Sequence, residues 1–248
     1  MLAMVVPCYN EVMRFNVLKW QETISEFQNC QWIFVNDGST DKTFRILTLL
    51  TKNNVHLVDL PKNKGKGEAI RAGFNFALAL SKNQPISRIG YLDSDFAFDL
   101  EDVRAVFIES ESKLGKDAKY RTIIGSRVKL AGRKIQRSNV RHYLGRAIAT
   151  YICQGWVLAP YDTQSGFKIF TFDSYFREAI SRSFVTSWFF DIEIILRLEQ
   201  INSLGVWEIP LTEWSEIEGS NIKPIDFFLI LKQILYARSL VRRHCKDL

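Results

Sequence analysis

Two aspartates separated by one residue form the sharpest chemical feature of this 248-residue chain. Asp93 and Asp95 directly follow the apolar segment 89–92, which has the character of a buried strand. If the chain turns after that strand, both carboxylates face one point. Mg²⁺ or Mn²⁺ binds such paired oxygens together with substrate phosphates. Because short acidic motifs are frequent, a solvated acidic loop is the alternative interpretation.

A second polar cluster follows the apolar segment 32–35. It contains Asp37, which can accept hydrogen bonds from a base or a ribose, and Gly38, which lets a ligand approach the backbone. A strand-to-helix turn explains the same residues without any ligand. Both interpretations place Asp37 at the end of a strand.

The segment 63–67 contains two glycines and two lysines, Lys64 and Lys66. It lacks the spacing of a P-loop, and Ile70 stands where the last glycine of a dinucleotide-binding motif would lie. A basic loop that opens a helix suits phosphate groups, because backbone N–H groups at a helix start point outward. An ordinary turn remains the alternative.

Basic residues are concentrated in one segment. Residues 112–146 contain 11 Lys or Arg and one acid, whereas the rest of the chain has 22 basic and 26 acidic residues. Such a patch predicts a localised anionic partner: phosphate groups, nucleic acid or an acidic membrane surface. Arg137 and Arg141 are four residues apart and would share one face of a helix.

The elements that must position these residues alternate between strands and helices in the first half. The apolar patterns predict strands over 4–7, 32–35, 55–60, 89–92 and 122–125, with helices between them. This order predicts an α/β fold with a mainly parallel central sheet and helices on both faces. Ligands bind such sheets at the carboxyl ends of the strands, where the polar clusters fall.

The second half has a looser pattern. We expect helices over 140–151, 191–200 and 225–243, and short strands over 167–170 and 206–209. Without a linker or repeat, residues 1–248 are interpreted as one domain, with a nucleotide-binding half (1–127) and an acceptor-side half (128–248). The last helix is amphipathic. Its apolar face, with Leu231 and Leu235, is expected to pack on the core, and its basic end to face an anionic membrane.

Composition excludes several classes of protein. With 47% hydrophobic and 24% charged residues the chain is a folded protein, and its four cysteines lack zinc-ligand or disulfide-scaffold spacing. No segment is long and apolar enough to span a membrane, so the expected location is cytoplasmic, with peripheral contact at the cytoplasmic face of a membrane. No nucleic acid is expected, because the basic segment lacks an aromatic stacking pattern and the acidic cleft repels a phosphate backbone.

Taken together, these motifs resemble the family 2 glycosyltransferases of the GT-A fold, especially those that transfer a sugar to a polyprenyl phosphate, such as the dolichyl-phosphate glucosyl- and mannosyltransferases. The resemblance spans nearly the whole chain and is carried by seven segments: 6–11, 36–41, 63–67, 93–95, 125–127, 162–168 and 216–220.

The resemblance implies a role for each matching residue. The donor, with UDP-glucose favoured and GDP-mannose as the other candidate, would contact Pro7, Tyr9, Glu11, Asp37, Lys66, Asp93 and Asp95. The metal, Mg²⁺ or Mn²⁺, would be held by Asp93 and Asp95. The acceptor phosphate would contact Arg137, Arg141, Gln164 and Lys168, with Asp95, Arg127 and Asp191 as catalytic residues.

The expected reaction inverts the anomeric centre. A phosphate acceptor is already ionised near neutral pH and needs no strong base. The alternative acceptor, a sugar hydroxyl in polysaccharide or glycan synthesis, needs one, and Asp191 is the candidate. Charge on the departing nucleoside diphosphate would be stabilised by the cation and nearby basic residues.

Overall fold

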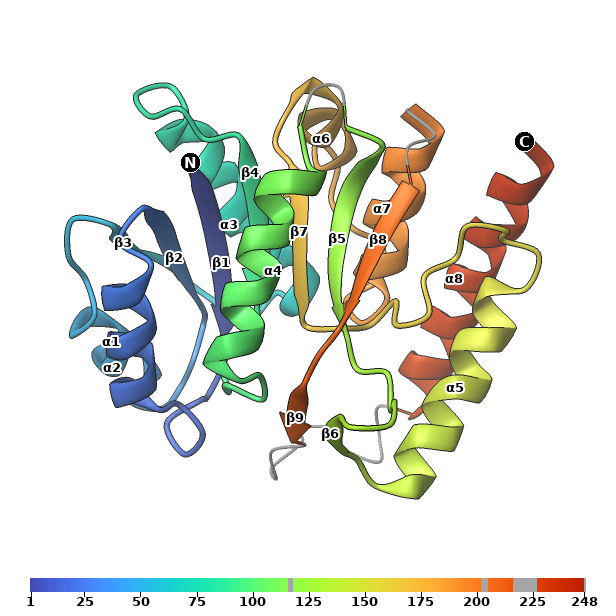
Figure 1. Ribbon diagram of the computed structural model, residues 1–248, viewed down its shortest axis with the longest axis horizontal. Coiled ribbons are helices and arrows are strands. Elements are labelled where there is room, and N and C mark those ends of the chain that lie inside the picture. Colours follow the sequence, from blue (N-terminus) through green and yellow to red (C-terminus); the bar gives the residue numbers. More distant parts are fainter. Residues whose placement is uncertain (116–117, 202–204, 216–226, 248) are drawn as a thin grey trace.

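The computed structural model describes residues 1–115, 118–201, 205–215 and 227–247, so the predicted motif at 216–220 lies outside the described residues. Seven strands form one sheet in the order β3-β2-β1-β4-β7-β5-β8 (Figure 1). Their bounds are Leu2–Cys8 (β1), Cys30–Asp37 (β2), Val55–Leu60 (β3), Arg88–Leu92 (β4), Tyr120–Ser126 (β5), Phe167–Thr171 (β7) and Gly205–Pro210 (β8). Two short strands, β6 (Lys134–Gln136) and β9 (Glu213–Ser215), pair separately.

Strand direction decides where the polar clusters meet. All neighbours in the sheet are parallel except β7, which runs antiparallel to both β4 and β5. The carboxyl ends of β1, β2, β4 and β5 therefore share one edge with the amino end of β7. The predicted mainly parallel α/β sheet is confirmed, and the segments that follow these strands lie along one edge.

Helices cover both faces of the sheet because its strands are apolar on both sides. Along β1, Ala3 and Val5 belong to one buried cluster, and Met4 and Val6 to the other. The first face packs against α3 (Lys66–Leu80), α6 (Ser174–Ala179) and α7 (Phe190–Ile201). The second packs against α1 (Val17–Glu26), α2 (Thr43–Thr48) and α4 (Leu100–Lys113).

Helix α3 lies unusually close to the sheet. A Cβ added to Gly73 would lie 2.4 Å from Cγ1 of Val5, so only glycine permits this approach. The close packing fixes α3 over β1 and β2, and its first residue, Lys66, lies at the same edge as the strand ends.

Two further helices, α5 (Asn139–Cys153) and α8 (Phe227–Asp247), pack against each other beside the sheet, and α8 also contacts α7 (Figure 1). The predicted orientation of α8 is wrong. Leu231 and Leu235 are 43% and 53% exposed, whereas the buried face includes Gln233, Arg238 and His244. These polar side chains are buried because each has a partner on the body of the protein. Within the described ranges, no helix is long and apolar enough to cross a membrane.

Candidate active site

The loop after β2 is organised by Asp37. Its carboxylate oxygens accept hydrogen bonds from the backbone N–H groups of Lys64 (2.8 Å) and Gly65 (2.9 Å). Burial raises the pKa of Asp37, and these two bonds oppose the rise. Gly38 has a φ of +63°, and a Cβ there would lie 2.3 Å from the carbonyl carbon of Lys62. Asp37 therefore shapes the basic loop, and its predicted contact with the donor stays a prediction.

The first residue of α3 lies against the first aspartate of the Asp-x-Asp motif. Nζ of Lys66 is 2.6 Å from Oδ1 of Asp93. Burial lowers the pKa of Lys66, but the neighbouring carboxylates, led by Asp93, outweigh it and raise the pKa overall. Gly166 makes room for this pair, since a Cβ there would overlap the Asp93 carboxylate at 1.9 Å. The charged Lys66 at a helix start offers a site for an anionic group.

The second aspartate lies in a sharp turn. Phe96 has a φ of +53°, in the left-handed region, and Oδ1 of Asp95 accepts a hydrogen bond from the N–H of Ala97 at 3.2 Å. Oδ2 of Asp95 is 3.9 Å from the guanidinium of Arg14. Burial, and then the neighbouring Asp93, raise the pKa of Asp95. The turn expected from the motif is therefore present.

The two aspartates fit a divalent cation. They are hard oxygen ligands, and their side chains keep 30% and 22% of their exposure. In the part of the chain that the structure describes, no group of three or more His, Cys, Asp or Glu gathers around one point. The chain thus supplies two carboxylates, and a cation bound there would complete its shell with phosphate oxygens and water.

Glu11 follows β1 and lies buried beside the same edge. Its backbone N–H donates to Oγ1 of Thr43 at 2.8 Å, and its Oε1 pairs with Arg14 at 2.6 Å. Its Oε2 is buried and has no hydrogen-bond partner among the described residues. Burial raises the pKa of Glu11 to about 7, against the effect of Arg14. Nearby, Pro7 and Tyr9 are half-buried at the end of β1.

The raised pKa of Glu11 predicts a pH-dependent stability. The carboxyl group ionises near pH 4.5 in the unfolded chain and near pH 7 in the folded one. As the pH rises from 4.5 to 7, ionisation therefore stabilises the unfolded state relative to the folded state. We expect the free energy of unfolding to fall by roughly 3 kcal/mol between these values. Glu11→Gln should remove that fall, as measured by urea denaturation from pH 5 to pH 8. A variant that keeps the wild-type pH profile contradicts the assignment, and the exposed Glu22→Gln is the control.

Arg127, at the end of β5, is already paired. Its Nε and Nη2 each lie 2.7 Å from the carboxylate of Asp162, which also accepts a bond from the Arg127 backbone N–H. Burial opposes ionisation of Asp162, but Arg127 outweighs it and lowers the pKa to about 2. Arg127 also lies over the ring of Trp214. A phosphate contact by Arg127 would compete with Asp162.

Lys168 and Asp191 form a buried pair beneath the site. Nζ of Lys168 lies 2.7 Å from Oδ1 of Asp191, 2.9 Å from the hydroxyl of Tyr91 and 2.6 Å from the carbonyl of Ser165. Tyr91 also donates to Asp191. Burial raises the pKa of Asp191 and lowers that of Lys168. Because Lys168 is fully buried, this position does not favour its predicted contact with an acceptor, and Asp191 is not open to solvent as a base.

Two of the predicted acceptor residues, Arg137 and Gln164, lie near Arg127. Arg137, Arg146 and Gln164 line a small hollow of about 30 Å³, together with Arg127 and Asp162. The backbone of Arg141 lies on α5, but its side chain is outside the described part of the structure.

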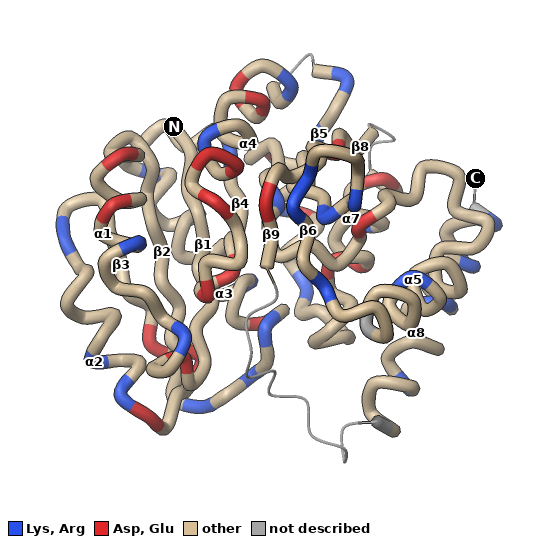
Figure 2. Tube along the Cα trace, turned by 60° about the horizontal axis from the view of Figure 1, so that its bottom comes forward, with Lys and Arg blue, Asp and Glu red and all other residues tan. Residues whose placement is uncertain are grey.

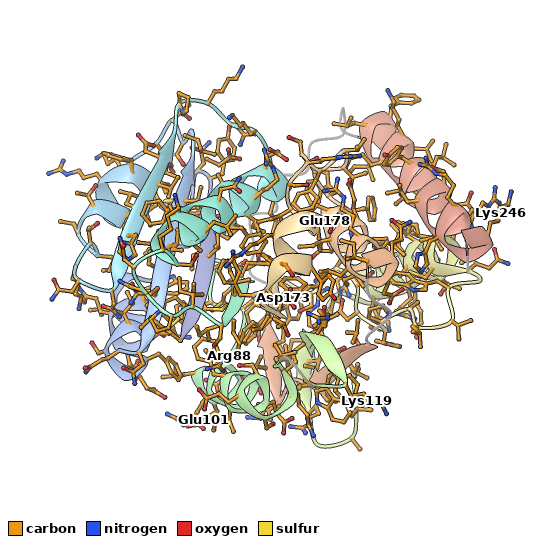
Figure 3. All side chains as sticks on the ribbon, turned by 90° about the horizontal axis from the view of Figure 1, so that it is seen from above. Arg88, Glu101, Lys119, Asp173, Glu178 and Lys246 are labelled. Carbon is orange, nitrogen blue, oxygen red and sulfur yellow. The ribbon has the colours of Figure 1, made fainter. Side chains whose placement is uncertain are left out.

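A larger hollow, of about 820 Å³, lies elsewhere. It is lined by Met1 and Arg88, at the amino ends of β1 and β4, and by Phe27, at the end of α1. Arg88, at the start of β4, is labelled in the view from above (Figure 3). Its charged side chains are paired with each other, as in Arg88–Glu111 and Arg104–Glu26. The polar clusters of the sequence do not reach it.

Comparison with known proteins identifies the family of the chain. Residues 3–114 match the family model described as glycosyl transferase family 2. A dolichyl-phosphate beta-glucosyltransferase from Trichomonas vaginalis is 32% identical over 90% of this chain and 68% of its own. The enzymes of the same name from Homo sapiens and Saccharomyces cerevisiae are 32% and 30% identical, each over 96% of this chain and 74% of their own.

Solved structures agree on the fold. The glucosyl-3-phosphoglycerate synthase of Mycobacterium tuberculosis, crystallised with Mn²⁺, UDP-glucose and phosphoglyceric acid, superposes with a TM-score of 0.65 at 16% identity. The match covers 99% of this chain and 80% of that one. The same enzyme with Mg²⁺ and UDP gives a TM-score of 0.64. The likeness confirms the predicted GT-A fold. With this fold and these relatives, the chain belongs to glycosyl transferase family 2 and is a glycosyltransferase related to the dolichyl-phosphate beta-glucosyltransferases.

Proposed function

We propose that this chain transfers glucose from UDP-glucose to a polyprenyl phosphate, with inversion at the anomeric carbon. The names of its relatives at 30–32% identity support this donor sugar and this type of acceptor. The burial and hydrogen bonding of Asp191 are the observations that favour a phosphate acceptor over a sugar hydroxyl.

A sugar hydroxyl needs a base to remove its proton during attack, whereas a phosphate monoester is already an anion near neutral pH. Asp191 was the predicted base, but Lys168 and Tyr91 both engage its Oδ1, and it is 4% exposed. Although burial raises its pKa, a carboxyl group closed to solvent in this way is poorly placed to take a proton from a sugar hydroxyl. The arrangement therefore favours the phosphate acceptor.

For the donor, we assign the uridine to the segment after β1 that carries Pro7, Tyr9 and Glu11. The unpartnered Oε2 of Glu11 is a ready acceptor for a ribose hydroxyl or a base N–H. The diphosphate would lie at the start of α3, where Lys66 and the backbone N–H groups offer positive charge.

During transfer, negative charge develops on the departing UDP. Lys66 is placed to stabilise that charge, and Asp93 keeps its ammonium group oriented. Asp93 and Asp95 would hold Mg²⁺ or Mn²⁺, which supplies further charge stabilisation at the diphosphate when bound. The bidentate ion pair of Arg127 and Asp162 would separate the donor side from the acceptor side.

The acceptor assignment is tested at Arg137. Arg137→Ala should raise the KM for a polyprenyl phosphate by about tenfold or more, because a bond between a charged donor and phosphate contributes about 1.5–3 kcal/mol. The KM for UDP-glucose should change less than twofold. Arg133→Ala, an exposed arginine of the same basic segment, is the matched control. Equal changes in both KM values, or faster transfer to a soluble sugar hydroxyl, would contradict the lipid-phosphate acceptor.

A lipid-linked acceptor requires contact with a membrane, and we propose that α5 and α8 provide it at the cytoplasmic face. Both helices expose large apolar side chains, namely Val140, Tyr143, Leu144, Phe228, Leu229, Leu231 and Leu235. Exposed basic residues accompany them on α8, at Lys232, Arg242, Arg243 and Lys246. Figure 2 shows basic residues along these two helices, and Figure 3 places Lys246 at the outer end of α8. Apolar and basic side chains on one side match an anionic lipid surface.

Vesicle flotation tests this contact. The double variant Arg242→Gln/Arg243→Gln should bind phosphatidylglycerol vesicles about 30-fold more weakly at low salt, since each lost charge removes about 1 kcal/mol. Lys42→Gln/Arg45→Gln, near the α2 end of the sheet, is the matched control. Wild-type protein that fails to float at low salt, or a control that loses as much binding, would contradict α8 as the docking element.

A further inference from the structure

Helix α8 holds the loop that precedes α7 through one side chain. Gln233 is 8% exposed. Its Oε1 accepts a hydrogen bond from the backbone N–H of Trp188 at 3.0 Å, and its Nε2 lies 3.2 Å from Oγ of Ser187. Burying an amide side chain without hydrogen-bond partners costs free energy. The packing of Gln233 and the conformation of the loop therefore stabilise each other.

The loop lies between the donor side and the acceptor side of the site. A Cβ added to Gly65, in the basic loop, would lie 3.1 Å from Cβ of Ser187. The carbonyl of Trp188 faces Nε2 of Gln164 at 3.4 Å. Helix α7 begins at Phe190, and Asp191 is its second residue. Any shift of Trp188 therefore reaches Gln164 and the start of α7 directly.

The same helix turns an apolar side outward. Leu231 and Leu235, two residues to either side of Gln233, are exposed, and Phe228 is 81% exposed. A lipid surface that takes up these side chains would restrict the position of α8 relative to the body of the protein. Gln233 supplies the hydrogen bonds from α8 to Ser187 and Trp188 in the loop before α7.

We propose that Gln233 is a positioning residue that couples the seating of α8 to the acceptor side of the active site, so that a lipid surface bound by α8 raises the rate of transfer. The inference rests on the proposed function for its acceptor and its membrane contact. It adds that the membrane is an activator of the site as well as the place where the acceptor is found.

The test uses UDP-glucose and a water-soluble, short-chain isoprenyl phosphate, with or without phosphatidylglycerol vesicles that contain no acceptor. For wild-type protein, vesicles should raise kcat/KM for the short acceptor by about fivefold or more, the lower range of ordinary coupling between sites. Gln233→Met should lose this response while binding vesicles and UDP within about twofold of wild type, as coupling is removed without loss of either site.

Two variants separate positioning from general loosening. Gln233→Glu keeps the oxygen that accepts from Trp188 and should restore the response. Arg238→Met removes a contact of α8 with the end of α5, at the carbonyl of Gln154, and leaves the loop untouched. It should lower the melting temperature and keep the response. If Arg238→Met abolishes the response as Gln233→Met does, or if Gln233→Met still responds, the assignment of Gln233 is overturned.

A second readout keeps the coupling apart from the choice of acceptor. Amide hydrogen exchange over 185–190 should slow when wild-type protein binds vesicles, and not in Gln233→Met. Absence of transfer to any isoprenyl phosphate, together with this slowing, overturns the proposed acceptor and supports the coupling. Transfer without any slowing overturns the coupling and supports the acceptor.

Discussion

Asp95→Asn is expected to lower the rate of glucose transfer by about 100-fold or more, the usual effect of removing one group that stabilises transition-state charge. Asp93 is engaged by Lys66, whereas Asp95 has its nearest charged partner, Arg14, 3.9 Å away. Asp95 is therefore the carboxylate with more freedom to bind a cation. In the wild type, Mn²⁺ should tighten binding of UDP in calorimetric titrations, and in the variant most of that gain should be lost.

The result must be separated from damage to the turn. Asp95 also accepts a bond from the Ala97 N–H, so a merely structural role predicts lower stability with the metal dependence kept. Asp99→Asn, at the exposed N-cap of α4, is the matched control for the loss of one carboxylate in this loop. Metal-dependent UDP binding that persists in Asp95→Asn would remove the aspartate pair from the cation site.

The sheet was largely predictable because its strands are continuous apolar runs that end in polar clusters. β1, β2 and β4 are buried along almost their whole length, and each is followed by a segment of the site. The direction of β7 was not predictable from its residues. Its five positions are all buried, so the pattern is the same whichever way the strand runs. Pairing with β4 and β5 decides the direction.

Short elements escaped the sequence analysis for a related reason. β6 and β9 have three residues each, too few for a periodic pattern, and they form by pairing with each other, with Ile135 opposite Trp214, 79 residues later. The six-residue α6 begins at the N-cap Asp173 and lies between two apolar segments. Long-range pairing and capping determine these elements.

The outward side of α8 shows how polar residues mislead a helical pattern. The apolar Leu231 and Leu235 face outward, whereas Gln233 and Arg238 face the protein. Gln233 accepts a hydrogen bond from the backbone N–H of Trp188, and Arg238 donates one to the carbonyl of Gln154. Those partners lie 45 and 84 residues earlier in the chain. Hydrophobic periodicity carries no information about such partners.

In the site, residue types were easier to predict than their partners. Lys66, Asp93 and Asp37 were expected to contact the donor, and they lie at the expected edge, but each also holds a neighbouring protein group. Asp162, as the partner of Arg127, was not anticipated, because the two lie 35 residues apart. Tyr91 was read as a strand residue only, and its hydroxyl reaches Asp191 across 100 residues.

The pairing of Lys168 with Asp191 gives the largest expected effect on stability. Lys168→Met should lower the free energy of unfolding by about 3–5 kcal/mol, because it leaves a buried carboxyl group without its partner. Burial already raises the pKa of Asp191 in the wild type, and loss of the neighbouring ammonium group should raise it further. The loss should therefore be small near pH 4 and grow as the pH rises, by up to about 1.4 kcal/mol per pH unit.

Urea denaturation of Lys168→Met between pH 4 and pH 8 measures both effects, with the exposed Lys62→Met as the matched control. Adding Asp191→Asn to Lys168→Met should recover part of the loss, since the amide is neutral and still accepts a hydrogen bond from Tyr91. A loss that is the same at every pH, or a double variant no more stable than Lys168→Met, would mean that Lys168 acts by filling space. In that case the charge state of Asp191 would not depend on Lys168, and the main argument for a phosphate acceptor over a hydroxyl would fail.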